Sequence, residues 1–158
     1  MASYTGAMRI QTEAELREIV PSPPSKVRLK ILNKLEHHSH FIIGMSRLVA
    51  MATHDGRGLS DVRVIDAPGR VVPTGEEDRH LLVADPGEAL PCPAHVGALF
   101  LVPGIGETLR VNGRIIDRRE GQALFEVDEV YLQCPKAIVR SELWKPETWT
   151  SNAPASET

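Results

Sequence analysis

Five side chains of the sequence are candidates for proton transfer: His54, Asp61, Asp66, His95 and Glu107. Imidazoles and carboxylates act as general acids and bases when a pocket holds them close to the reacting atoms. The sequence alone does not select among the five, and it contains no Gly-x-Ser-x-Gly or other nucleophile motif. The catalytic residues are therefore unknown from the sequence.

Two cations near the end of the chain could hold an anion. Lys136 and Arg140 are four residues apart, in a segment that begins at Pro135 and predicts a short helix over residues 135–144. Side chains four residues apart lie on one face of a helix and can grip the same anion. The alternative is that they form surface ion pairs with Glu129 or Glu142.

The histidines and cysteines do not predict a metal site. His37, His38 and His40 are nearly adjacent, so their side chains cannot all point one way, and no thiol or carboxylate at ligand spacing accompanies them. Cys92 and Cys134 are too far apart for a Cys-x-x-Cys site, which favours two reduced thiols. We predict no bound metal.

Composition limits the class of protein. The 158 residues, 42% hydrophobic and 25% charged, suit one globular domain. The net charge of −3 comes without a Lys/Arg block, so we do not expect nucleic acid as a partner. The apolar stretches are shorter than the roughly 20 residues of a membrane span, and the N-terminus lacks a signal-peptide pattern. A cytoplasmic protein that does not bind membranes is expected.

Hydrophobic periodicity predicts a mainly β fold with flanking helices. Thr12 and Glu15 form a capping box for a helix over residues 12–19, and apolar spacing predicts a second helix over residues 25–35. Strands are predicted at 48–53, 61–66, 71–72, 80–84, 95–102, 108–117 and 123–133. Short strands separated by Gly and Pro indicate a barrel or sandwich. We expect a flexible N-terminus (1–9), one domain (10–146) and a disordered tail (147–158).

Three segments resemble a known family. They are residues 10–35, residues 99–113 (LFLVPGIGETLRVNG) and residues 131–144 (YLQCPKAIVRSELW). Together they look like the FMN-binding split-barrel proteins related to pyridoxamine 5'-phosphate oxidase, in particular a subgroup of small bacterial flavoproteins. The similarity covers most of residues 10–146, and the second and third segments are the more specific.

The resemblance implies a six-stranded split barrel that forms a homodimer, with one FMN at each end of the subunit interface. The chain would then be an oxidoreductase that acts on a small organic molecule, and the flavin would carry the electron transfer. The FMN-binding residues that the resemblance implies are Arg63, Thr108, Lys136, Arg140, Ser141 and Trp144.

The sequence departs from this family at the FMN phosphate. The position that is usually arginine is Ile65, with Arg63 two residues earlier, and the basic segment expected after Ala84 is missing. Asp85 and Glu88 would place negative charge there instead. The alternative is a flavin-free split-barrel protein that binds a small organic molecule, or catalyses its cyclisation or isomerisation, in the vacated cleft. A third possibility is a subunit that pairs with a flavin-competent relative.

Overall fold

The computed structural model describes residues 9–22, 24, 30–84 and 90–147. The chain divides into two units, residues 1–30 and residues 31–158. In the first unit, helix α1 (Glu13–Ile19) begins as the capping box predicts, because the Thr12 hydroxyl accepts a hydrogen bond from the Glu15 backbone N–H at 3.3 Å. Residues 1–8 and 148–158 lie outside the described part, and with them most of both predicted flexible ends.

The helix predicted over residues 25–35 is wrong in the part that the structure describes. Residues 25–29 lie outside that part, and from Lys30 to Leu35 the chain is not helical. Leu32 instead forms an antiparallel bridge with Val130, with backbone hydrogen bonds of 2.9 and 2.7 Å. A tertiary contact thus overrides the four-residue apolar spacing. The next helix, α3, spans His37–Met45.

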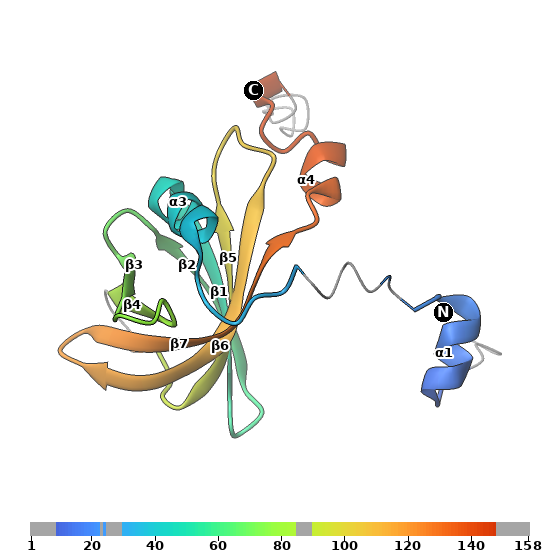
Figure 1. Ribbon diagram of the computed structural model, residues 1–158, viewed down its shortest axis with the longest axis horizontal. Helices are drawn as coiled ribbons and strands as arrows, with labels where there is room; N and C mark the ends of the chain where they lie inside the picture. Colours follow the sequence, from blue (N-terminus) through green and yellow to red (C-terminus); the bar gives the residue numbers. More distant parts are fainter. Residues whose placement is uncertain (1–8, 23, 25–29, 85–89, 148–158) are drawn as a thin grey trace, which may run out of the picture. The chain divides into compact units, whose positions relative to one another are not determined.

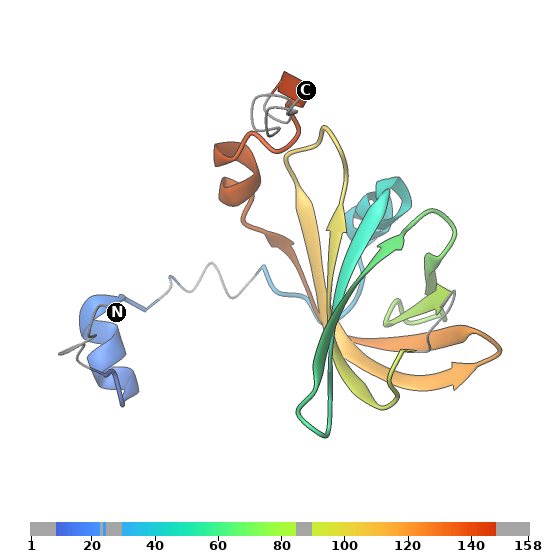
Figure 2. The ribbon, with the colours of Figure 1, turned by 180° about the vertical axis from the view of Figure 1, so that it is seen from behind.

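The second unit is built on one antiparallel sheet of seven strands, one more than the family resemblance implies. The strands follow the order β2-β1-β5-β6-β7-β4-β3 and curl into a half-barrel (Figures 1 and 2). This mainly β architecture is as predicted and fits a split barrel. The strands are β1 (Leu48–Asp55), β2 (Ser60–Asp66), β3 (Val71–Thr74), β4 (His80–Ala84), β5 (Ala94–Leu101), β6 (Thr108–Arg119) and β7 (Gln122–Gln133).

The core lies on the inner face of this sheet. Side chains alternate between the two faces of a strand, and in β5 the inner positions Val96, Ala98 and Phe100 are buried. Phe125 of β7 is fully buried among them, and α3 adds Ile42 and Ile43 to the same cluster. The outer face of β1, β2, β5 and β6 is not covered by another described element of this unit.

A β-bulge shifts the register between β6 and β7 and so determines which residues of β7 lie on the outer face. Asn112 pairs with Glu129 and Gly113 with Val127, so Asp128 has no partner residue on β6. Gly113 is required there, because a Cβ at this position would overlap the Glu126 carbonyl oxygen and the Phe125 ring. The bulge therefore places both Asp128 and Glu129 beside the outer face.

Helix α4 (Lys136–Arg140) follows β7 after Pro135, as the sequence predicts. It has no buried residue. Among the described residues, no helix is both long and apolar enough to cross a membrane.

Candidate functional site

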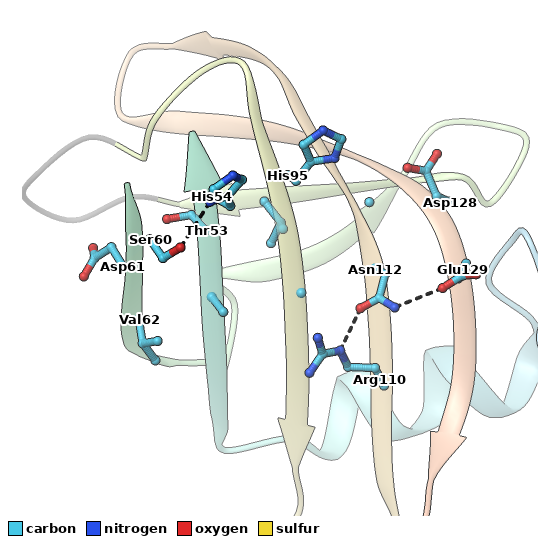
Figure 3. A pocket seen from close by; sticks show the side chains of 14 residues that line it. Thr53, His54, Ser60, Asp61, Val62, His95, Arg110, Asn112, Asp128 and Glu129 are labelled. Atoms are coloured by element: carbon cyan, nitrogen blue, oxygen red, sulfur yellow. Dashed lines mark hydrogen bonds between the residues drawn. The ribbon is translucent and has the colours of Figure 1, made fainter. Parts of the chain in front are cut away.

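The outer face of the sheet carries a groove of about 600 Å³, open to solvent (Figure 3). Its floor follows one cross-strand row in which Val62, Ala52, Gly97, Asn112 and Glu129 are successive partners on five strands. Alanine and glycine at two of these positions leave the hollow. The groove is lined by Ala52, Thr53, His54, Ser60, Asp61, Val62, His95, Val96, Gly97, Arg110, Asn112, Gly113, Asp128 and Glu129.

Two imidazoles lie at one end of this groove. His54 of β1 and His95 of β5 are direct cross-strand partners on the outer face, which places their Cβ atoms roughly 4.5–5.5 Å apart. His54 Nδ1 lies 3.1 Å from the Ser60 hydroxyl oxygen. Of the five candidate acids and bases, the structure brings His54, His95 and Asp61 to the groove.

The other two candidates lie elsewhere and are engaged in local contacts. Asp66 forms an ion pair with Arg70 at 3.1 Å, and Glu107 contacts His38 at 3.2 Å. His38 and His40 have different partners, Glu107 and Asp78, so the histidines of α3 do not converge. In the described part of the chain, no group of three or more His, Cys, Asp or Glu could hold a metal ion.

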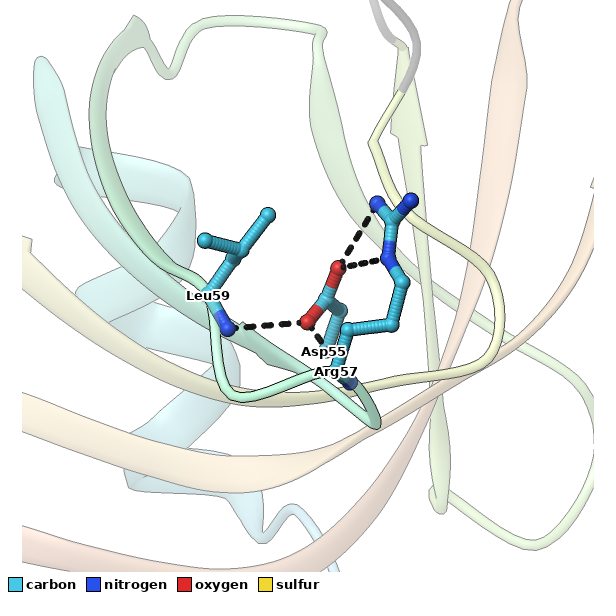
Figure 4. Close-up of polar contacts among 3 residues, drawn as sticks. All are labelled: Asp55, Arg57 and Leu59. Atoms are coloured by element: carbon cyan, nitrogen blue, oxygen red, sulfur yellow. Dashed lines mark hydrogen bonds and ion pairs between the residues drawn. The ribbon is translucent and has the colours of Figure 1, made fainter.

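The turn between β1 and β2 positions Ser60 against His54. The Asp55 carboxylate accepts hydrogen bonds from the backbone N–H groups of Arg57 and Leu59 at 2.9 and 3.0 Å (Figure 4). Arg57 also forms an ion pair with Asp55 at 2.9 Å. The Leu59 N–H, together with Arg57, lowers the pKa of Asp55 below its ordinary value, although partial burial opposes this. This turn fixes where β2 begins.

A chain of hydrogen bonds crosses the middle of the groove. Arg110 Nε donates to Asn112 Oδ1 at 2.7 Å, and Asn112 Nδ2 donates to Glu129 Oε2 at 3.0 Å (Figure 3). The Arg110 guanidinium lies over Gly97, where a Cβ would overlap its Nη2 atom. Gly97 thus makes room for the guanidinium, and Asn112 orients it.

The other charges of the groove are paired. Asp61 accepts a hydrogen bond from Arg63 at 2.8 Å, and this contact lowers the pKa of Asp61. Asp128 lies 3.4 Å from Arg114. With Arg63 and Arg114 balancing Asp61 and Asp128, the groove has no excess of positive charge that would attract a phosphate dianion.

The FMN-binding residues predicted from the resemblance are distributed over the unit. Arg63 is half-buried on β2, Thr108 is buried at the start of β6, and the Ser141 hydroxyl donates to the Ile138 carbonyl. β2 and β7, which leads into α4, are four strand spacings apart in the sheet, roughly 19 Å along it. The role of these residues in FMN binding stays a prediction.

The cations of α4 are exposed. In the described part of the chain, Glu142 forms an ion pair with Lys145 at 2.6 Å, and Glu129 accepts a hydrogen bond from Asn112. The choice between an anion site and surface ion pairs with Glu129 or Glu142 stays a prediction. Trp144 is half-buried, and its buried Nε1 has no hydrogen-bond acceptor in the described structure.

Comparison with known proteins gives one structural likeness. No protein-family model and no curated protein matches the sequence. A crystal structure of a HupZ variant from Group A Streptococcus is similar with a TM-score of 0.48 and 9% identity, over 62% of this chain and 98% of that chain. The function of this chain is therefore inferred from its own residues.

Proposed function

We propose that this chain binds a small organic molecule in the outer groove and rearranges it by proton transfer without a redox step. The observation that carries this proposal is the direct pairing of His54 with His95 in a groove that Arg110 also lines. One imidazole can remove a proton while the other returns one, which is the balance that a cyclisation or an isomerisation requires. The Arg110 guanidinium can bind an anionic group of the substrate and so orient the molecule toward the imidazoles.

A second copy of the chain is the proposed cover of the groove. Val62 and Val64 are 68% and 62% exposed on the outer face of β2, directly beside the groove. An apolar strip of this kind is typical of a contact surface, and covering it would also exclude water from the groove. We therefore propose a homodimer in which this face of the sheet is the interface.

Filling the groove tests the binding site. Ala52 is exposed on the groove floor, so Ala52→Leu should occupy the space without disturbing the core. We expect the wild-type protein to show ligand-dependent increases of Tm in a screen of small organic acids, amines and alcohols, and the variant to lose them. Ala137→Leu, on the exposed surface of α4, is the matched control. Equal increases in wild type and Ala52→Leu would contradict the proposal.

FMN is the second candidate ligand, and part of the groove favours it. The small residues Ala52 and Gly97 would let a flat isoalloxazine ring lie on the sheet, with Arg110 beside it. The groove of one chain does not fit the phosphate, because Arg110 is the only lysine or arginine among its lining residues and a dianion needs more compensation. Lys136 and Arg140 are not among the residues that line the groove. Bound FMN would supply the electron transfer of an oxidoreductase.

The absorption spectrum of the purified protein separates the two candidates. We expect no flavin bands, either as purified or after incubation with excess FMN and desalting. Flavin bands that survive desalting, and disappear in the double variant Lys136→Ala with Arg140→Ala, would replace the non-redox proposal with the flavoprotein.

A further inference from the structure

Arg110 and Glu129 are two opposite charges that the protein holds close together without pairing them. In the described residues, no carboxylate lies within ion-pair distance of Arg110, and no cation lies within that distance of Glu129. Each is bonded to the neutral amide of Asn112 instead. Arg110 is half-buried, and its terminal nitrogens have no acceptor in the described part of the chain, which favours an anion from outside the chain.

The spacing of the two charges suits one small molecule. The two contacts measure 2.7 and 3.0 Å, and an amide is about 2.3 Å across, so Arg110 Nε and Glu129 Oε2 are at most about 8 Å apart. In an α-amino acid the carboxylate and the ammonium are about 3 Å apart, and each charge-assisted hydrogen bond adds about 2.8 Å. A zwitterion of this size therefore spans the gap from guanidinium to carboxylate.

We infer that the substrate of the groove carries an amino-carboxylate group, with its carboxylate on Arg110 and its ammonium on Glu129. This inference rests on the proposed function, whose site it specifies. His54 and His95 are two residues along their strands from Ala52 and Gly97, which is roughly 7 Å. The imidazoles thus reach the part of the molecule beyond the anchored head group. The groove volume of about 600 Å³ leaves room for that part.

Three ligands of similar shape test the two anchors separately. L-phenylalanine carries both charges, 3-phenylpropanoate only the carboxylate, and 2-phenylethylamine only the ammonium. Using protein NMR titration and calorimetry, we expect phenylalanine to bind at least roughly tenfold more tightly than either analogue. Arg110→Gln should weaken phenylalanine and 3-phenylpropanoate by roughly tenfold and leave 2-phenylethylamine unchanged, whereas Glu129→Gln should do the converse.

Arg119→Gln is the matched control, because Arg119 lies at the far end of β6 and pairs with Asp117 at 2.9 Å. It should leave all three affinities unchanged. Equal binding of the three ligands, no binding of phenylalanine up to about 10 mM, or equal losses for all three in Arg110→Gln would overturn the inference. So would a dimer that dissociates in Arg110→Gln while every affinity is retained, since the guanidinium would then serve the subunit contact.

A neutral ligand distinguishes failure of this inference from failure of the proposed function. If 2-phenylethanol shifts the resonances of Ala52 and Gly97 and phenylalanine does not, the amino-carboxylate assignment is wrong and the groove remains a binding site. If none of the four compounds shifts them, both are contradicted.

Discussion

The two faces of the sheet use opposite kinds of residue on the same strands. In β5 the inner positions Val96, Ala98 and Phe100 are buried in the core, whereas the alternate positions His95 and Gly97 lie on the outer face and line the groove. On the inner face, apolar side chains fill the core and exclude water, and this close packing stabilises the fold. On the outer face, a glycine and ionisable side chains occupy positions that do not contribute to the packing of the core. Residues that contribute little to packing are the ones available for binding.

The largest expected effect lies on the inner face. Phe125 is fully buried in the core, so Phe125→Ala should lower the free energy of unfolding by about 3–5 kcal/mol, because it removes a large apolar side chain and leaves a cavity. Chemical denaturation measures this loss. Phe41, which is 54% exposed on α3, gives the matched control, and Phe41→Ala should cost well under half as much. Similar losses for both variants would show that the inner face is not the core.

A smaller, pH-dependent effect is expected at the turn that positions the groove. The pKa of Asp55 is lowered in the folded protein, so its carboxylate stabilises the fold above the unfolded pKa of about 3.9, and this contribution is lost as the pH falls through the lower folded value. Asp55→Asn should therefore unfold at a lower temperature than wild type at pH 7. The gap in Tm should close below about pH 4. A gap that is constant from pH 7 to pH 2 would contradict the assignment of the effect to this carboxylate.

The smallest effect on folding, but the largest on assembly, is expected on the apolar strip of the outer face. Val62→Asp combined with Val64→Asp changes two exposed side chains, so chain folding, followed by circular dichroism, should be nearly unchanged. Light scattering should show the wild type as a dimer and the double variant as a monomer, because two carboxylates per chain would be desolvated in the interface. A wild-type protein that is monomeric in light scattering would contradict the proposed interface.

Local patterns in the sequence predict much of the fold. Thr12 and Glu15 locate the start of α1, and alternating apolar residues locate most strands of the sheet, because both signals come from neighbouring residues. The predicted helix over residues 25–35 fails in its described part because Leu32 pairs with Val130, almost a hundred residues later. No local pattern contains that contact.

The groove could not be predicted from the sequence, because it too depends on contacts between residues that are far apart in the chain. His54 faces His95, and Gly97 accommodates Arg110, only through pairings of β1 with β5 and of β5 with β6 in one register. The sequence does place Arg110 and Asn112 on one face of a predicted strand, because they alternate with Leu109 and Val111, but this is also the ordinary pattern of a strand with one face in solvent. The sequence identifies His54, Asp61 and His95 as candidate acids and bases. It does not predict that the three lie in one groove.

The most direct test of the groove as the functional site is an NMR titration of the wild-type protein with L-phenylalanine, with backbone amides observed on both faces of the sheet. We predict shifts confined to the outer positions Ala52, Gly97 and Asn112, with the inner positions Leu81 and Phe125 unchanged. Shifts on another surface, or no shift at the outer positions with any small organic acid, amine or alcohol, would contradict the assignment of function to this face.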